Sequence, residues 1–205
     1  MKKATSVPNR MHLSRRTAAK GTLLLGACVV IPVSLLPGVA GAFDLSQRSG
    51  NSNIQELSEA LRVTQKTACL IMADQLDALG MTASGFDLHL RSAGLVQQDA
   101  LKIATAISRL SGTNGPSMRS FSVSYNREIG DIGASALVQS LPASVTEIGM
   151  VGCDLGDDSG KVLLDWAGQP SALRMICVEN NLYSTQMRNR ISDLRHSRPS
   201  LFVAV

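Results

Sequence analysis

Aromatic residues and cysteines are both scarce in this sequence. Only 3% of the 205 residues are aromatic, and four are cysteines. Four cysteines in a chain of this length are too few for a disulfide-stabilised scaffold. Charged residues make up 18% of the chain and apolar residues 44%, which excludes an intrinsically disordered protein. The length suits one domain with a substantial hydrophobic core.

Acidic residues are missing from the first 42 positions, although these positions hold six of the 20 Lys and Arg residues. Beyond Ala42, 14 basic residues stand against 16 acidic ones. The positive net charge of the whole sequence therefore belongs to its N-terminal segment. Because the rest of the chain has no basic excess, we do not expect a nucleic-acid partner.

Residues 1–42 have the pattern of an export signal peptide. A basic stretch leads into the apolar segment Thr22–Leu36, and a small-x-small site follows at Ala40–Ala42. We expect cleavage after Ala42. Lipidation at Cys28, or retention of the segment as an anchor, remains an alternative. Beyond this segment, we expect no stable membrane insertion, since no later run is long and apolar enough to span a bilayer.

Adjacent arginines in the leader resemble the twin-arginine export motif. Arg15 and Arg16 are followed by Lys20, as in that motif, but Ala18-Ala19 replaces its usual large apolar pair. The resemblance implies export of an already folded protein, and the general secretory route stays open. Either route predicts a periplasmic or secreted protein.

A single long helix is expected directly before the repeated part of the sequence. Residues 43–52 are polar and predict a linker. Asn53 and Glu56 fit a capping box at the start of a helix over 53–80, which Gly80 would end. The apolar positions of this helix recur at steps of three and four residues; they include Ile54, Leu57, Leu61, Ala68, Met72, Leu76 and Leu79.

The sequence repeats itself from residue 85 onward. Met118, Val145, Leu173 and Leu201 begin segments spaced by 27, 28 and 28 residues. In the best copy, Phe121 and Val123 alternate with serines, as in a strand with one apolar face. Helical stretches rich in Ala and Leu separate the copies, and prolines follow them; three such stretches are Gly133–Leu141, Gly160–Ala167 and Gln186–Leu194.

The order L-x-x-L-x-L-x-x-N/C in these copies resembles the leucine-rich repeat, and the unit length resembles its ribonuclease-inhibitor-type class. The resemblance covers residues 85–205, with an imperfect first copy. It implies an α/β fold in which a short solenoid of parallel strands and outer helices follows an N-terminal capping helix. It also implies a non-catalytic module that mediates protein–protein interaction.

Asn126, Cys153 and Asn181 occupy the turn position that follows each strand. A side-chain amide at such a turn can bind backbone groups that the turn leaves unpaired. Cys153 has a small side chain that can be buried in the same place. We therefore assign all three residues a structural role.

The strand residues that point away from the helices should form a concave, partner-binding face. The candidate contact residues on this face are His89, Arg91, Ser122, Ser124, Glu147, Val151, Cys177 and Glu179. The face mixes polar and small residues, and Trp and Tyr anchors are missing from these positions, which favours narrow recognition of a protein partner.

No enzyme, cofactor or metal site is predicted. His89 and Cys177 are three strands apart in the expected sheet, about 14 Å at the usual strand spacing, which is too far for a nucleophile pair. Cys153 and Cys177 should point to opposite faces and stay unpaired. The acidic segment Asp154–Asp158 lacks the spacing of a calcium loop and is better placed to stabilise a helix N-terminus.

Two surfaces near the C-terminal end leave further alternatives. Residues Leu201–Val205 are apolar and should form the last strand, whose edge could pair with a partner or a second copy. The alternative function is therefore a structural subunit of a cell-envelope complex, assembled through this strand. A basic cluster should lie on the last helix, most simply as a solvated face, with contact to anionic lipid or an acidic partner as the alternative; its members are Arg188, Arg190, Arg195, His196 and Arg198.

Overall fold

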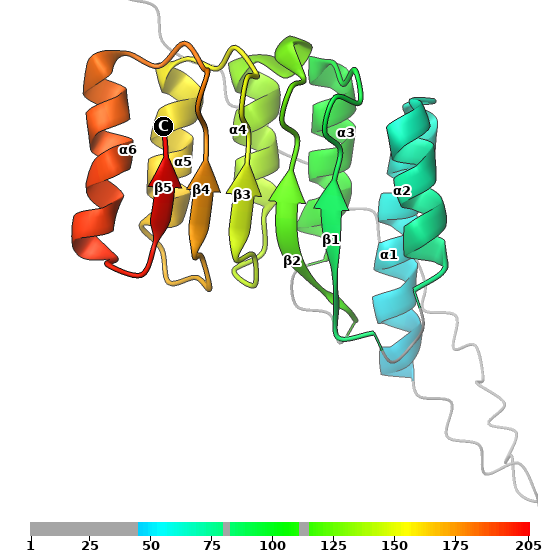
Figure 1. Ribbon diagram of the computed structural model, residues 1–205. Coiled ribbons are helices and arrows are strands. Elements are labelled where there is room, and N and C mark those ends of the chain that lie inside the picture. Colours follow the sequence, from blue (N-terminus) through cyan, green and yellow to red (C-terminus); the bar gives the residue numbers. More distant parts are fainter. Residues whose placement is uncertain (1–44, 80–82, 111–114) are drawn as a thin grey trace, which may run out of the picture. The chain divides into compact units, whose positions relative to one another are not determined.

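Parallel strands alternate with helices along the chain in the computed structural model (Figure 1). The structure describes residues 45–79, 83–110 and 115–205, which belong to one compact region. The predicted export signal, with Arg15, Arg16, Cys28 and Ala42, lies outside the described residues. The strands are β1 (Gly85–His89), β2 (Ser117–Ser122), β3 (Glu147–Gly149), β4 (Met175–Cys177) and β5 (Phe202–Ala204).

The helices within the described residues are α1 (Leu45–Val63), α2 (Thr67–Asp77), α3 (Gln97–Ser108), α4 (Gly130–Ser140), α5 (Asp157–Ala167) and α6 (Thr185–Ser197). A short 3₁₀ turn, Arg127–Ile129, precedes α4. Figure 1 shows α3 to α6 on one side of the sheet, each returning the chain to the start of the next strand. The predicted α/β class with a parallel sheet is confirmed, with strand order β1-β2-β3-β4-β5.

Buried apolar side chains stand in register from strand to strand. Leu88 is aligned with Phe121, Phe121 with Ile148, Ile148 with Ile176, and Ile176 with Val203. All five are at most 6% exposed. Since each short strand alone would leave this side chain in water, burial of the row against α3 to α6 stabilises the sheet as a whole.

The predicted turn residues bind the backbone of the preceding strand–helix segment. Asn126 Nδ2 donates to the carbonyls of Leu90 (2.8 Å) and Val123 (2.7 Å), and its Oδ1 accepts from the Leu95 amide (3.0 Å). Asn181 makes the corresponding bonds two repeats later, including one from Nδ2 to the Met150 carbonyl at 2.8 Å. These are the backbone groups that a buried turn would otherwise leave unpaired.

Cys153 takes the same turn position with a thiol. Its Sγ donates to the Val123 carbonyl at 3.3 Å, and Val123 corresponds to Leu90 and Met150 in the neighbouring segments. The side chain is fully buried. Its backbone amide donates to Asn181 Oδ1 at 2.9 Å, so the asparagine of the next segment binds the backbone of the Cys153 turn.

Each turn also contains one residue in the left-handed backbone region, just before the turn residue. Ser92, Tyr125, Gly152 and Asn180 have φ angles of 51°, 63°, 61° and 57°. Glycine and asparagine adopt this conformation readily, whereas a bulky aromatic residue rarely does. Tyr125 is therefore the unusual member of the series.

The prediction of one continuous helix over 53–80 is wrong, because the helix breaks at Thr64–Lys66. The Thr64 hydroxyl donates to the Leu61 carbonyl (2.7 Å) and accepts from the Lys66 amide (3.2 Å), and Gln65 has a φ of 55°. Such local side-chain bonds compete with the helical ladder and end α1. The break shifts the apolar stripe by one residue, so α2 buries Cys69 and Ala73 instead of Ala68 and Met72.

The predicted linker and helix start are wrong as well, since α1 already begins at Leu45. Asn53 does not start a helix: its Nδ2 donates to the Arg109 carbonyl at 2.7 Å, just after α3. Glu56 forms an ion pair with the Arg109 side chain. The two residues that suggested a capping box thus connect α1 to the end of α3.

Candidate binding face

The sheet face opposite α3 to α6 (Figure 1) is called the open face below. The strand register arranges its residues in three rows that run across the strands. The strand register confirms the central row His89, Ser122, Gly149 and Cys177, and extends it to Ala204. A second row contains Asp87, Ser120, Glu147, Met175 and Phe202. The third, beyond the strand ends, contains Arg91, Ser124, Val151 and Glu179.

The predicted contact residues differ in how far solvent reaches them. His89, Arg91 and Glu147 are exposed, while Ser122, Val151, Cys177 and Glu179 are partly buried. Ser124 is only 3% exposed, and its hydroxyl accepts from the Val151 amide at 3.1 Å. Ser124 therefore ties two strand ends together and does not offer a contact surface, contrary to the prediction.

A chain of hydrogen bonds joins three strands on the open face. His89 Nε2 lies 2.8 Å from Ser120 Oγ, and Ser120 Oγ donates to Glu147 Oε2 at 3.2 Å. Since the single hydroxyl proton goes to the carboxylate, the serine oxygen accepts from the imidazole N–H. In this arrangement the three side chains position one another across β1, β2 and β3.

Carboxylates and a thiol share the β3–β4 part of the open face. Partial burial raises the pKa of the Cys177 thiol, and the negative charges of Glu179 and Glu147 raise it further. One oxygen of Glu179, Oε2, is buried and has no hydrogen-bond partner among the described residues. A buried carboxylate oxygen without a donor lowers the stability of the folded chain at this position.

The side chains of the central row are small, and Gly149 packs closely against Ser122. A Cβ atom on Gly149 would lie 2.9 Å from Ser122 Oγ and 3.3 Å from Ser122 Cβ. Cys177 and Ala204 continue this row of small side chains. Glu147 and Glu179 stand in the two outer rows, so this part of the open face is acidic near β3 and β4.

Sequence reasoning missed two exposed aromatic residues at this face. Phe202 on β5 is 57% exposed beside Met175, which is 37% exposed. Tyr125, at the end of β2, is 43% exposed, and the Arg91 guanidinium stacks over its ring at 4.3 Å from the centroid. The signal for Phe202 was present in the sequence, since its position continues the row of Met175. Nothing in the repeat pattern identifies Tyr125, whose direction depends on its left-handed backbone.

The alternative sites considered from the sequence do not come together. His89 on β1 and Cys177 on β4 are separated by β2 and β3, and Cys153 and Cys177 are both free thiols. Asp157 begins α5, where its carboxylate accepts from the Ser184 amide at 2.8 Å. Within the described residues, no group of three His, Cys, Asp or Glu side chains is arranged to hold a metal ion.

The basic residues of α6 are partly engaged with the protein itself. Arg188 donates to the Tyr183 carbonyl at 2.5 Å, and Arg198 donates to the Gln169 carbonyl at 3.0 Å. His196 lies 3.5 Å from Asp193 on the same helix. These contacts fit the interpretation of the cluster as a solvated helix face.

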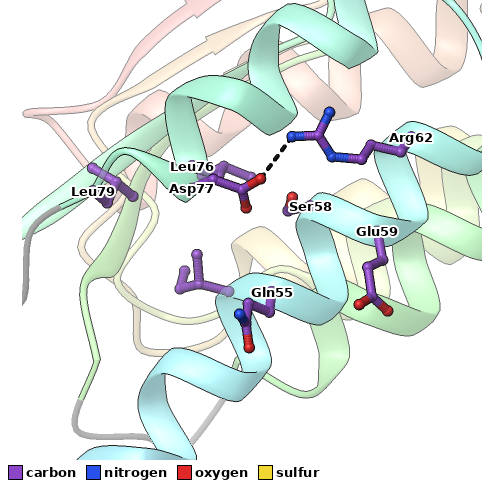
Figure 2. Close-up of a pocket in the computed structure, with 8 residues that line it drawn as sticks. Gln55, Ser58, Glu59, Arg62, Leu76, Asp77 and Leu79 are labelled. Atoms are coloured by element: carbon purple, nitrogen blue, oxygen red, sulfur yellow. Dashed lines mark hydrogen bonds and ion pairs between the residues drawn. The ribbon is translucent and has the colours of Figure 1, made fainter.

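A pocket of about 420 Å³ lies between α1 and α2. Figure 2 shows Ser58 and Arg62 of α1 facing Asp77 of α2, and the Arg62–Asp77 ion pair closes this side at 2.6 Å. The hydrogen bond from Ser58 and the charge of Arg62 lower the pKa of the Asp77 carboxyl. Arg62 and Asp77 thus satisfy each other and hold the helix pair together.

No family model matches the chain, and no curated protein sequence matches it. Among the described helices, none has the length and apolarity that a membrane span requires.

Proposed function

We propose that this protein is an exported leucine-rich repeat protein that binds a protein partner through its open face and catalyses no reaction. The repeat spacing, the in-register apolar row and the turn bonds of Asn126, Cys153 and Asn181 support the repeat assignment. The leader sequence supports export to the periplasm or beyond.

The observation that carries the binding proposal is the pair of carboxylates, Glu147 and Glu179, whose negative charges both act on Cys177 in the central row of small side chains. A partner that places a lysine or arginine side chain over the central row would balance both carboxylates. Phe202, Met175 and Tyr125 are exposed on the same face, and they are residue types that anchor protein interfaces. The partner is therefore a protein with an exposed basic side chain among apolar neighbours.

The test is affinity capture from the native cell envelope with the triple variant Glu147→Gln, Cys177→Ser, Glu179→Gln. We expect the wild-type protein to retain a specific partner that the triple variant loses. The matched control is Asp158→Asn with Asp165→Asn, which removes two exposed carboxylates from α5 on the other side of the sheet. Equal capture by all three proteins would place the contact on another surface.

One observation favours a second candidate, a structural subunit of an envelope complex. Among the described strands, β5 pairs with β4 alone, and it presents the exposed Phe202 next to its free edge. Assembly through this strand would cover both features. Size-exclusion chromatography of wild-type protein and Phe202→Ser separates the candidates, because only a subunit that assembles through β5 would change its apparent size.

A further inference from the structure

The ring of Tyr125 contacts the segments on both sides of its own. The Arg91 guanidinium carbon lies 4.3 Å from the centroid of the ring. On Gly152, a Cβ atom would lie 3.1 Å from Tyr125 Cδ1 and 3.2 Å from Cε1, so the ring packs against the backbone of this glycine. Three successive segments thus contribute to one stack. A planar guanidinium that stacks on an aromatic ring is held in a defined orientation.

Tyr125 adopts a backbone conformation that is costly for a large side chain. Its φ of 63° lies in the left-handed region, where the Cβ atom comes close to the following carbonyl oxygen. The equivalent residues of the other segments, Ser92, Gly152 and Asn180, have smaller side chains. Because the tyrosine side chain is 43% exposed, burial in the core does not explain the choice of residue. A strained and exposed aromatic residue points to a role in recognition.

The guanidinium of Arg91 has donor groups available for a ligand. Within the described part of the chain, its side chain makes no hydrogen bond and no ion pair. Arg127, one residue after the next turn, lies 3.8 Å from the Asp154 carboxylate by contrast. Stacking occupies the flat face of the Arg91 guanidinium, so its in-plane N–H groups can still bind a carboxylate through two parallel hydrogen bonds.

Opposite charges mark the two ends of the third row of the open face. Arg91 is its first residue, Glu179 is its last, and the neutral Ser124 and Val151 lie between them. Backbone hydrogen bonds of 2.7 and 2.9 Å keep the segments in register here, beyond the strand ends. Three steps of about 4.8 Å separate the ends of the row by about 14 Å. The open face is therefore positive at its Arg91 end and negative near Glu179 and Glu147.

We propose that the partner of the open face presents an Asp or Glu side chain to Arg91, in addition to the basic side chain that faces Glu147 and Glu179. Arg91 binds the carboxylate through its in-plane N–H groups, and Tyr125 holds the guanidinium in position. The two charged groups of the partner are about 14 Å apart, which an extended segment covers in about four residues. This inference rests on the proposed function, because one protein partner supplies both groups.

The test begins with random dodecapeptides displayed on phage and selected on the full-length chain. Fluorescence polarisation with the selected peptides then measures their affinity. Peptides that bind the open face are recognised by their loss of binding to the triple variant Glu147→Gln, Cys177→Ser, Glu179→Gln. We expect these peptides to carry an acidic and a basic residue about four positions apart.

Arg91→Gln should weaken the binding of these peptides roughly tenfold, since a charge-assisted pair is lost. The matched control is Arg127→Gln, which removes an exposed arginine that already has Asp154 as its partner and should bind within about twofold of wild type. Tyr125→Asn should also weaken binding while the protein stays folded, because asparagine adopts the left-handed region readily.

A double-mutant cycle and a spectrum identify the contact directly. Replacing the acidic residue of the peptide by its amide should weaken binding to wild type roughly tenfold, but to Arg91→Gln by about twofold or less, because the pair is already broken there. In ¹⁵N side-chain spectra, the Nε–H signal of Arg91, assigned by its loss in Arg91→Lys, should shift when the peptide binds.

Three outcomes would overturn the inference. The first is that Arg91→Gln leaves the affinity of the open-face peptides unchanged; in that case the proposed function stands, since these peptides still depend on Glu147 and Glu179. The second is that the losses in the cycle are additive or that the Arg91 signal stays in place. The third is that no selected peptide binds the open face, and capture from the envelope then decides the proposed function separately.

Discussion

Asn126 Nδ2 donates a hydrogen bond to the Leu90 carbonyl, 2.8 Å away and 36 positions earlier in the chain. Asn181 repeats the bond to Met150, and Cys153 repeats it to Val123 through its thiol. Every strand–helix segment after the first is thus fastened to the one before it by a single turn residue. In the sequence, this requirement appears as Asn126, Cys153 and Asn181 at the turn position of three successive copies.

Replacing Asn126 with alanine should lower the free energy of unfolding by about 3 kcal/mol, because buried backbone groups of Leu90, Val123 and Leu95 lose their partner. Urea denaturation followed by circular dichroism measures the change. Asn189→Ala, on the exposed side of α6, should shift stability by less than about 0.5 kcal/mol. Equal effects of the two changes would contradict the role of the turn.

The repeat made most of the sheet predictable from sequence. Phe121, Ile148 and Ile176 recur at a spacing that accommodates one strand and one helix. Their alignment on neighbouring strands, and the rows of the open face, could therefore be predicted from the repeat length. The turn role of Asn126 followed as well, because the residue type and its position after a strand both pointed to backbone bonds.

The parts outside the repeat were predicted poorly, for physical reasons. The break at Thr64 depends on one hydroxyl that competes with the helical hydrogen bonds. Asn53 and Glu56 both bind Arg109, which lies more than 50 positions away in the sequence. Such tertiary contacts override a local capping pattern. The position of α2 beside β1 (Figure 1) was equally unpredictable, because it depends on where the second helix turns back.

Cys177 should react slowly with iodoacetamide at neutral pH, and Glu179→Gln should increase the rate roughly two- to threefold. The pKa of Cys177 is raised by burial and then by Glu179 and Glu147, so less thiolate is present at a given pH; removal of one negative neighbour lowers the pKa and increases the thiolate fraction.

Mass spectrometry of the alkylated protein measures this rate, in a Cys28→Ser background so that the leader thiol does not contribute. Cys69 and Cys153 are fully buried and should stay unmodified in the native protein. Glu128→Gln lies elsewhere on the surface and should leave the rate unchanged. A rate that Glu179→Gln does not alter would show that access, not charge, controls this thiol.

Acid should destabilise the protein through Asp77 and Asp157, whose carboxyl pKa values are lowered in the folded state. Ser58 and Arg62 lower the pKa of Asp77, and the hydroxyl and amide of Ser184 lower that of Asp157. A lowered folded-state pKa stabilises the protein at pH values above the ordinary carboxyl pKa of about 4, and this contribution is lost as the pH falls through the folded-state value.

Thermal melting between pH 7 and pH 2 tests this. Asp77→Asn should melt below wild type at pH 7, and the difference should shrink below about pH 5 as the wild-type carboxyl becomes protonated. Asp165→Asn, on the exposed side of α5, should follow wild type throughout. If the difference in melting temperature between Asp77→Asn and wild type stays constant with pH, titration of Asp77 does not cause that difference.

Gly133 sets the distance between α3 and α4, because a Cβ atom there would lie 2.9 Å from Ala100 Cβ and 3.4 Å from Gln97 Cα. Gly133→Val should therefore destabilise the protein by about 2 kcal/mol or more, although replacing an exposed helical glycine usually stabilises a helix. The matched control Gln139→Val introduces the same β-branched residue at an exposed position of α4 and should cost about 0.5 kcal/mol or less. Urea denaturation compares the two, and a similar loss in both would assign the effect to helix propensity instead of the close approach of α3 and α4.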